Sequence, residues 1–302
     1  MREDRIGFIG LGNMGARMTR RLVDAGVSVL GLDRDCTRAE PAGAQNAASI
    51  KEVMAFADVI MLSLPDSRVV ESVVEGEDGI LAHVKPGQTV VDLSTAAASS
   101  TIRLHGLLAA RGAQYIDAGI SGGAAAAEKG TLTLMIGGDE AAIEAVRWAF
   151  APISTKALNM GASGAGHTTK LLNNFLNAVS LAATAEVMVA GKKAGLDLHQ
   201  LLDVLNSSSG VNFATLNRFP SIVDGNYLEG GLTNKLMTKD VVLYLDRTRE
   251  LGVASLNASG PLASFGLATA LGYGDQISNK VVDAIGDVSG KVRLHHSKGN
   301  QQ

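Results

Sequence analysis

Four polar side chains share one face near the start of a long apolar helical run. They are Lys170, Asn173, Asn174 and Asn177. Residues three, four and seven apart lie on the same face of a helix, so one amine and three carboxamides would form a polar stripe. A helix start that is simply solvated would also carry lysine and asparagine. We favour a functional stripe, because the residues that follow are apolar on nearly every side and polar groups beside buried surface need partners.

A second pattern, near the beginning of the chain, is typical of nucleotide binding. Residues 5–10 form an apolar run that predicts a buried strand, and a G-x-G-x-x-G sequence and a helical segment follow it. In a chain with 35 glycines this sequence alone would mean little, but between a strand and a helix it predicts a dinucleotide site. The first glycine permits a tight turn, the second admits a pyrophosphate and the third allows close packing. The residues of this turn are Gly10, Leu11, Gly12, Asn13, Met14 and Gly15.

A second predicted strand, over residues 28–32, leads to Asp33, close to the position of the acid that binds the ribose hydroxyls in such sites. A carboxylate there would pair with the hydroxyls and repel a 2′-phosphate, which favours NAD. The neighbouring Arg34 argues for NADP, because an arginine can bind that phosphate. We give the acid more weight and expect NAD, with NADP as the alternative.

A helix of unusual length must position the polar stripe. Residues 168–194 contain no proline and only Gly191 as a helix breaker, so about 27 residues would form a helix about 40 Å long. Before it, strands predicted at 58–64, 89–93, 114–117 and 131–136 alternate with helices, which predicts an α/β fold with a parallel sheet covered on both faces. After Leu158 no strand pattern appears. Helices are expected at 198–205, 227–249 and 261–271, so the second half is predicted to be all-α.

Ligands of parallel sheets bind at the carboxyl ends of the strands. Two such ends carry Leu64 with Pro65 and Ser94 with Thr95, and we assign both to the cofactor cleft. Pro65 is equally consistent with a plain strand terminator, whereas the Thr95 hydroxyl can bond a ligand.

Two further segments are ambiguous by composition. Ser121, Gly122 and Gly123 form a turn whose N–H groups could hold a carboxylate, but a flexible loop is the simpler interpretation. Lys239 and Asp240 stand in an amphipathic run, where a surface ion pair is usual.

Composition excludes several classes of protein. With 302 residues, 46% hydrophobic and 19% charged, the chain is globular and long enough for two domains. A net charge of −3 gives no electrostatic reason to expect that the protein binds nucleic acid. The single cysteine, Cys36, excludes an intramolecular disulfide and a cysteine metal cluster. The N-terminus has no apolar leader and polar residues interrupt the long helix, so we expect a soluble, cytoplasmic protein with no membrane partner.

Five separated segments resemble the β-hydroxyacid dehydrogenase family, which includes 3-hydroxyisobutyrate dehydrogenase and tartronate semialdehyde reductases. The resemblance covers roughly residues 5–290, almost the whole chain. The segments are IGFIGLGNMGARM in the cofactor region, DLST at 92–95, DAGISGG at 117–123, GAGHTTKLLNN at 164–174 and KD at 239–240. Gly119 and Ala98 stand where the family commonly has proline, and we expect both to loosen loops near the substrate.

The resemblance implies a role for each matching residue. Lys170 would be catalytic. The substrate would be anchored by Asn174 and by the turn of Ser121, Gly122 and Gly123. Leu64, Pro65, Thr95 and Lys239 would contact the nicotinamide cofactor. These implied roles replace the loop and surface-pair interpretations given above.

The resemblance also implies an architecture. It would be a Rossmann domain over residues 1–162 and an all-helical domain over 163–292, entered through the long interdomain helix. A disordered tail is expected at 293–302, and the helical domain would form a homodimer or homotetramer.

The implied reaction is hydride transfer between a nicotinamide and a small β-hydroxy acid or its semialdehyde. Lys170 would give a proton to the carbonyl oxygen or take one from the hydroxyl, and Asn174 would hold the same oxygen. Burial beside an apolar face disfavours the charged ammonium and so assists proton exchange. No metal is required.

Three alternatives compete with this function. A 6-phosphogluconate dehydrogenase needs a histidine where Asn173 stands, so we discount it. A reductase of another carbonyl or imine substrate is a second, although imine reductases generally lack the lysine. The third is a catalytically silent NAD-binding interaction protein, against which the intact Lys170 and Asn174 argue.

Overall fold

The computed structural model describes residues 4–295 and divides the chain into two compact units. Unit 1 runs up to Lys170 and unit 2 starts at Leu171, so the division falls inside the long helix. Residues 296–302 of the expected tail lie outside the described residues.

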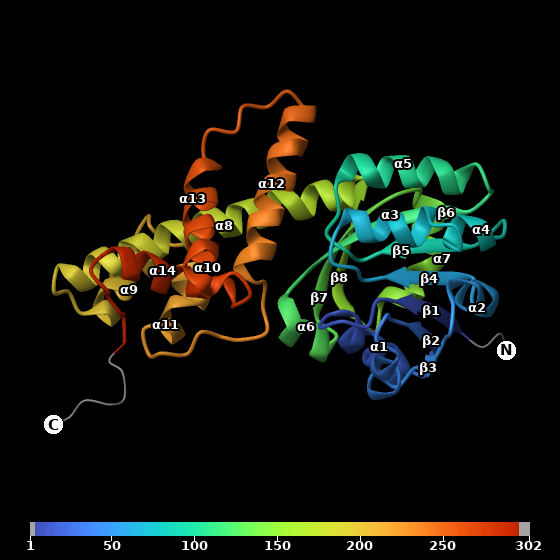
Figure 1. The fold of residues 1–302 in the computed structure, drawn as a ribbon, viewed down its shortest axis with the longest axis horizontal. Coiled ribbons are helices and arrows are strands. Elements are labelled where there is room, and N and C mark those ends of the chain that lie inside the picture. Colours follow the sequence, from blue (N-terminus) through green and yellow to red (C-terminus); the bar gives the residue numbers. More distant parts are fainter. Residues whose placement is uncertain (1–3, 296–302) are drawn as a thin grey trace. The chain divides into compact units, whose positions relative to one another are not determined.

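Unit 1 is built on one eight-stranded sheet with the order β3-β2-β1-β4-β5-β6-β7-β8 (Figure 1). The strands are β1 (Arg5–Ile9), β2 (Ser28–Leu32), β3 (Gln45–Asn46), β4 (Val59–Leu62), β5 (Thr89–Asp92), β6 (Gln114–Ser121), β7 (Leu132–Gly137) and β8 (Ser154–Gly161). Neighbouring strands from β3 to β6 are parallel, and helices alternate with them along the chain. The predicted α/β fold is confirmed.

Two apolar layers flank this sheet because the side chains of its strands alternate. In β4, Val59 and Met61 join one buried cluster, and Ile60 and Leu62 join the other. The first layer contains α1 (Gly15–Asp24), α6 (Gly123–Lys129) and α7 (Glu140–Phe150). The second contains α2 (Ile50–Phe56), α3 (Ser67–Glu75), α4 (Ile80–His83) and α5 (Ala98–Ala109).

The sheet differs from the prediction at both edges. The two-residue strand β3 at one edge was not predicted. β7 and β8 differ at the other edge. β7 is antiparallel to β6, because residues 122–131 form too short a connection for a parallel crossover. β8 was not predicted. It pairs parallel with β7, and most of its residues are exposed, so it carries none of the apolar alternation that marks a strand in sequence.

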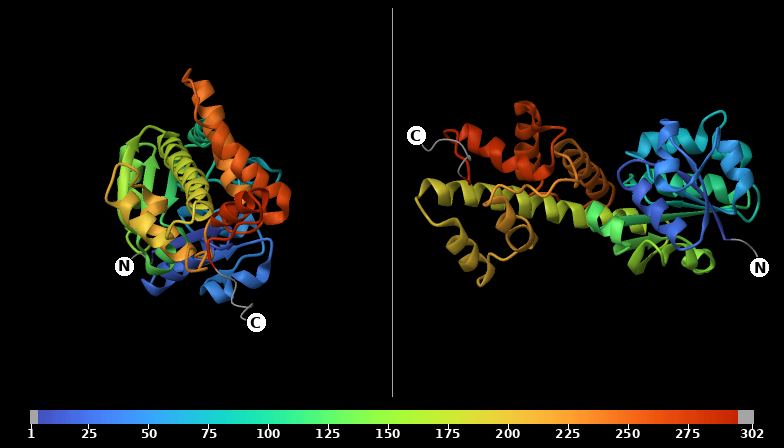
Figure 2. Two further views of the ribbon diagram at one scale, coloured as in Figure 1. Left: turned by 90° about the vertical axis from the view of Figure 1, so that its left-hand side faces the viewer. Right: turned by 90° about the horizontal axis from the view of Figure 1, so that it is seen from below.

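Unit 2 is helical, with one isolated bridge between Thr233 and Ile277 among its described residues. The long helix α8 (Ala165–Lys193) is continuous over 29 residues, as predicted (Figure 2). From Leu171 on, its buried face enters a core shared with the other helices. These are α9 (Leu198–Asn206), α10 (Phe213–Asn217), α11 (Phe219–Ile222), α12 (Asn234–Glu250), α13 (Ser259–Ala268) and α14 (Val281–Val288).

The helix predicted over 227–249 starts later than expected, as α12. Leu228 has a φ of 55°, which no helix accommodates, and the side chain of Thr233 accepts a hydrogen bond from Leu236 N. The start of α12 is therefore fixed by an N-cap that periodicity alone does not reveal.

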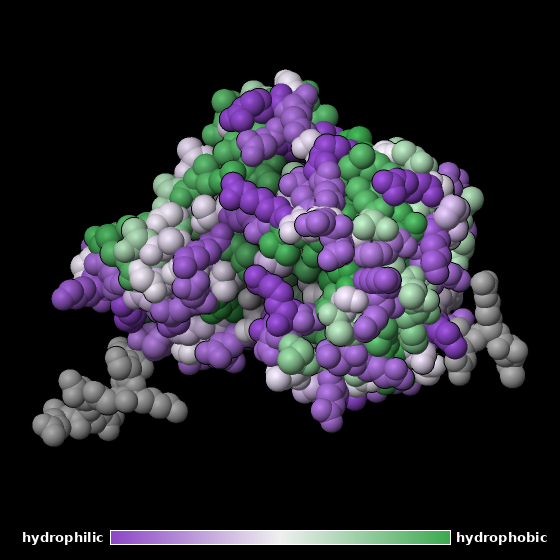
Figure 3. All heavy atoms as spheres, turned by 45° about the vertical axis from the view of Figure 1, so that its right-hand side comes forward, coloured by the Kyte–Doolittle hydropathy of each residue, from purple (hydrophilic) through white to green (hydrophobic). Residues whose placement is uncertain are grey.

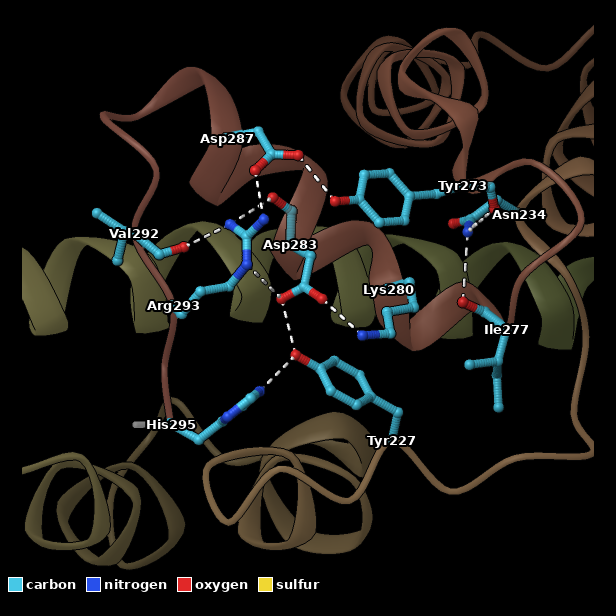
Figure 4. A network of polar contacts seen from close by, with 10 residues as sticks. All are labelled: Tyr227, Asn234, Tyr273, Ile277, Lys280, Asp283, Asp287, Val292, Arg293 and His295. Carbon is cyan, nitrogen blue, oxygen red and sulfur yellow. Dashed lines mark hydrogen bonds and ion pairs between the residues drawn. The ribbon is translucent and has the colours of Figure 1, made fainter. Parts of the chain in front are cut away.

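A polar network holds the end of the described chain. Figure 4 shows Asp283 between Tyr227, Lys280 and Arg293. The Tyr227 hydroxyl donates to Asp283 Oδ1 at 2.7 Å, and Lys280 Nζ lies 2.7 Å from Oδ2. Arg293 Nε lies 3.8 Å from Asp283 Oδ1, and the next residue, Leu294, is buried. The predicted disordered tail is therefore wrong for residues 293–295.

Large hydrophobic side chains remain exposed mainly in unit 2. Unit 1 exposes Ile102, Leu158 and Met160, and all other large exposed hydrophobics among the described residues lie in unit 2. On the face seen in Figure 3, hydrophobic atoms are interspersed with hydrophilic ones. Within residues 4–295 no helix is both long and apolar enough to cross a membrane.

Candidate active site

The turn that follows β1 contains three glycines with different surroundings. Gly10 has a φ of 94°, and a Cβ there would collide with Ser63 O. A Cβ on Gly15 would collide with Gly10 O, so α1 begins directly against the turn. Gly12 has open space on its Cβ side, where the nearest atom is Arg38 Nη1 at 3.9 Å. The turn therefore leaves room for a phosphate group beside the start of α1.

Asp33 follows β2 and is tied to the same turn. Its Oδ2 accepts a hydrogen bond from Leu11 N at 2.7 Å, and its Oδ1 accepts one from Asp35 N at 3.0 Å. Arg34 is exposed. Arg38, which sequence reasoning missed, places Nη1 3.6 Å from Asp33 Oδ1. A 3-10 turn over Cys36–Arg38 brings it there, and its spacing in the sequence gave no signal of this.

The carboxyl ends of β1, β4 and β5 are hydrogen-bonded to one another. Ser63 N donates to the last residue of β1 at 2.9 Å, and Leu64 N donates to Ser94 Oγ at 2.9 Å. Pro65 and Thr95 are the next residues on these two segments. The residues assigned to the cofactor cleft in unit 1 thus stand at one edge of the sheet.

Ser121 is the last residue of β6 and pairs with Thr133 of β7. Gly122 and Gly123 follow with φ values of 129° and 69°, and α6 begins at Gly123. The flexible loop that composition favoured is therefore wrong, because the segment is a strand end joined directly to a helix. Both φ values lie in the range that favours glycine, so these glycines set the direction of the turn.

Lys170 lies on α8 and is 8% exposed. Its stem packs against Gly119 of β6, where a Cβ would lie 2.6 Å from Lys170 Cβ. The expectation that Gly119 and Ala98 loosen loops is wrong. Gly119 is buried within β6, and Ala98 is the buried first residue of α5.

A buried carboxylate and a buried imidazole fix the start of α8. Asp117 of β6 accepts hydrogen bonds from Gly164 N and His167 N, both at 2.8 Å. His167 Nδ1 lies 2.7 Å from Thr101 Oγ1, and its Nε2 lies 4.0 Å from Asp92 Oδ2. A carboxylate is favourable at a helix N-terminus, where N–H groups have no partner within the helix. These contacts set the position of Lys170 one turn further along.

In unit 2, Asn174 is 2% exposed and donates from Nδ2 to Asp240 Oδ2 at 2.5 Å. Asn173 Nδ2 donates to Asn174 Oδ1 at 3.3 Å. Lys239 Nζ lies 3.2 Å from Asp240 Oδ1. Because Asp240 is 1% exposed, the expectation of a surface ion pair is wrong for it. Asp240 instead orients one amide and one amine.

The predicted site residues are divided between the two units. Unit 1 holds the cofactor turn, the strand ends, the turn at Ser121 and Lys170, and unit 2 holds Asn174 and Lys239. Sequence reasoning placed none of Asp117, His167 and Asp240 in the site. All three lie inside the segments that carry the family resemblance, which is the only signal that pointed to them.

Comparison with known proteins agrees with this geometry. The family model described as the NAD binding domain of 6-phosphogluconate dehydrogenase matches residues 5–161. A second, described as NAD-binding of NADP-dependent 3-hydroxyisobutyrate dehydrogenase, matches residues 164–285.

Individual relatives cover nearly the whole chain. A 2-(hydroxymethyl)glutarate dehydrogenase from Eubacterium barkeri is 33% identical over 92% of this chain and 93% of its own. An NAD-dependent L-serine dehydrogenase from Pseudomonas aeruginosa is 35% identical over 90% of this chain and 94% of its own. The structure of Mycobacterium tuberculosis 3-hydroxyisobutyrate dehydrogenase with L-serine has a TM-score of 0.85 and 32% identity, and covers 93% of this chain and 99% of that one. The chain therefore belongs to the β-hydroxyacid dehydrogenases, the NAD(P)-dependent family of 3-hydroxyisobutyrate dehydrogenase.

Proposed function

We propose that this enzyme oxidises a small β-hydroxy acid to its semialdehyde, or runs the reverse reduction, with Lys170 as general acid and base. The observation that carries the proposal is the placement of Lys170 in unit 1. Its amine stem is buried against Gly119, two residues before the turn of Ser121, Gly122 and Gly123. A proton-transferring group and a set of backbone donors for a carboxylate thus belong to neighbouring parts of one unit.

The cofactor turn suits a dinucleotide. The open side of Gly12 admits a pyrophosphate, and Gly10 and Gly15 bring strand and helix close enough to form the turn. Asp33 would bind the ribose hydroxyls, with Arg34 nearby, and Leu11, Asn13 and Met14 supply backbone around the phosphates. The rest of the cofactor would be contacted by Leu64, Pro65, Thr95 and Lys239. When bound, the nicotinamide supplies the carrier of the hydride.

The chain's own residues would handle the proton and the substrate. Lys170 Nζ takes a proton from the substrate hydroxyl in oxidation and returns it to the carbonyl oxygen in reduction. Asn174, held by Asp240, orients that oxygen. The N–H groups at Gly122 and Gly123, with the Ser121 hydroxyl, bind the carboxylate.

The names of the relatives support this substrate class. 2-(Hydroxymethyl)glutarate, L-serine and 3-hydroxyisobutyrate all contain a hydroxymethyl group on the carbon that bears a carboxylate. They differ only in the third substituent of that carbon. We infer that the substrate of this enzyme shares the common part.

At the level of the whole protein, we propose a cofactor domain over residues 1–162 and a helical substrate domain over 163–292. The protein would act in the cytoplasm as a homodimer or homotetramer. The exposed hydrophobic side chains of unit 2 support self-association.

A panel of hydroxy acids tests the function. Purified enzyme is given NAD or NADP and each acid, beside its methyl ester, and reduction of the cofactor is followed by absorbance. We expect turnover of at least one hydroxymethyl acid and poor turnover of its ester. Equal turnover of acid and ester would rule out the carboxylate site, and NADH binding without turnover of any acid would favour an NAD-binding interaction protein.

A further inference from the structure

Arg218 stands between α10 and α11 and is held by two amides. Its Nη1 donates to Asn279 Oδ1 at 2.8 Å, and its Nη2 donates to Asn177 Oδ1 at 3.1 Å. The guanidinium carbon also lies 5.7 Å from the centre of the Phe213 ring. Asn177 belongs to the polar stripe of α8, whereas Arg218 was not singled out in the sequence.

The positive charge of Arg218 has no anionic partner among the described residues. No carboxylate oxygen of residues 4–295 lies within 4.0 Å of it. Burial lowers the pKa of the Arg218 guanidinium to about 10. A cation that is partly removed from water is stabilised by an anionic partner, and amides do not neutralise its charge. The two bonds use two of the five N–H groups that a guanidinium carries, and the side chain is only half-buried, so an anion from solvent can reach it.

This charge lies close to the residue that would hold the reacting oxygen of the substrate. Asn177 follows Asn174 by three residues on α8, so the two amides share a face and are separated by a rise of about 4.5 Å. Arg218 is bonded to the second of them. A substrate that is bound at Asn174 and extends about one helical turn along α8 would therefore approach the guanidinium.

We propose that Arg218 binds a second carboxylate of the substrate, so that the preferred substrate is a hydroxymethyl diacid. The proposal rests on the proposed function of Asn174 and Lys170. A planar guanidinium matches a carboxylate through two parallel hydrogen bonds, which makes arginine suited to this task. Within unit 2, the second carboxylate would pair with the Arg218 guanidinium beside Asn177 of α8.

Arg218 could instead serve only as a link between α8, the α10–α11 junction and Asn279. Asn177→Asp separates the two roles. The aspartate keeps the oxygen that accepts from Arg218, and this is the only side-chain hydrogen bond of Asn177 within residues 4–295. It places a carboxylate on the guanidinium from within the protein. If Arg218 is only a structural link, this variant keeps or strengthens the link. If Arg218 binds the substrate, the new carboxylate occupies the guanidinium and competes with the substrate.

The kinetic test compares two substrates in four proteins. The substrates are 3-hydroxypropanoate and 2-(hydroxymethyl)glutarate, and the proteins are wild type, Arg218→Gln, Asn177→Asp and the exposed control Arg249→Gln. Wild type is expected to prefer the diacid. The ratio of kcat/KM for diacid over monoacid should fall about ten- to a hundred-fold in the first two variants, the size of a charged hydrogen bond, and should not change in the control. A wild type without preference, or a variant with equal losses on both acids, overturns the proposal.

Binding of glutarate, which has no hydroxyl to oxidise, distinguishes failure of this proposal from failure of the proposed function. Calorimetry should show glutarate binding to wild type and to Arg249→Gln, and strongly reduced binding to the other two variants. If glutarate binds in this way but no hydroxy acid is turned over, the anion site at Arg218 is supported and the proposed dehydrogenase function is rejected. If hydroxy acids are turned over but Arg218→Gln does not alter glutarate binding, the proposed function is supported and the anion site at Arg218 is rejected. Circular dichroism melting confirms that each variant is folded.

Discussion

Lys170 is confined by its surroundings in unit 1. It is 8% exposed, and its Cβ and Cγ pack against the bare backbone of Gly119. A long lysine side chain usually keeps much rotamer freedom, and confinement of its stem removes part of that freedom before substrate arrives. A group held in place in this way is suited to proton transfer, which requires the donor within hydrogen-bonding distance of the reacting oxygen.

Replacement of Lys170 tests its role directly. Lys170→Ala should lower kcat by about 10²- to 10⁴-fold, the usual value of general acid–base catalysis. NADH affinity, measured by fluorescence, should change little, because the glycine turn and Asp33 are untouched. Lys170→Arg should not restore activity, since a guanidinium stays protonated. Retention of more than about a tenth of the wild-type kcat would contradict an acid–base role.

Asp33 should set the choice of cofactor. Its carboxylate accepts a hydrogen bond from Leu11 N and stands where the ribose is expected, so kcat/KM should be higher with NAD than with NADP. Asp33→Asn keeps an acceptor and removes the charge, and it should lower the NAD over NADP ratio about ten-fold or more. Arg38→Gln, near the same carboxylate, should reduce activity with NADP. A wild type that prefers NADP would contradict the assignment.

The first turn of α8 packs against strands β6 and β7 through glycine, which has no side chain. A Cβ on Gly166 would lie 2.7 Å from Asp117 O, and one on Gly137 would lie 2.8 Å from Gly166 N. Neither residue has a φ in the left-handed range, so the need for glycine is steric. The backbones of the helix and the strands are therefore in contact, and the Asp117 carboxylate accepts hydrogen bonds from the N–H groups at the helix start.

Gly119→Ala should therefore displace Lys170 through a direct contact. The added methyl would lie 2.6 Å from Lys170 Cβ, so α8 must shift, which should cost about 1–3 kcal/mol of unfolding free energy. A displacement of about 1 Å can reduce kcat about 10²-fold. Gly106→Ala on α5 is the control, because nothing lies within 4 Å of its Cβ position, and it should stabilise by about 0.4–1 kcal/mol. Chemical denaturation and steady-state kinetics measure both effects. Normal kcat in folded Gly119→Ala would show that the close approach does not position Lys170.

For the molecule as a whole, the sequence predicted the features that periodicity and glycine spacing encode. The parallel strands β1, β2, β4 and β5, the helix α8 and the turn after β1 all follow from such patterns. The exposed strand β8 has no apolar alternation to reveal it. The antiparallel register of β7 depends on the length of a connection, which no residue type marks.

Contacts between residues far apart in the chain could not be predicted from the sequence alone. The pairing of Asp117 with the start of α8, of Asp240 with Asn174 and of Arg218 with Asn177 depends on tertiary packing. The resemblance identified the segments that hold most of these residues but not their partners. Arg218 lies outside those segments, so neither spacing nor resemblance drew attention to it.

Self-association is the prediction that belongs to the whole molecule. Unit 2 leaves large apolar side chains in water, among them Leu172 and Leu176, which are 44% and 66% exposed and four residues apart on α8. Contiguous exposed apolar surface in a soluble protein usually marks an interface. We expect wild type to sediment as a homodimer or homotetramer at micromolar concentration. Leu176→Glu would place a charge in that interface and should raise the dissociation constant at least about ten-fold.

The matched control for this experiment is Ile102→Glu, which alters one of the few large hydrophobic side chains that unit 1 exposes, at 47%. It should leave the sedimentation coefficient unchanged, because the proposed interface lies in unit 2. Both positions are exposed, so both variants should fold, which their melting curves would verify. A monomeric wild type would exclude the proposed assembly. An oligomer that Ile102→Glu dissociates and Leu176→Glu does not would place the interface in unit 1 instead.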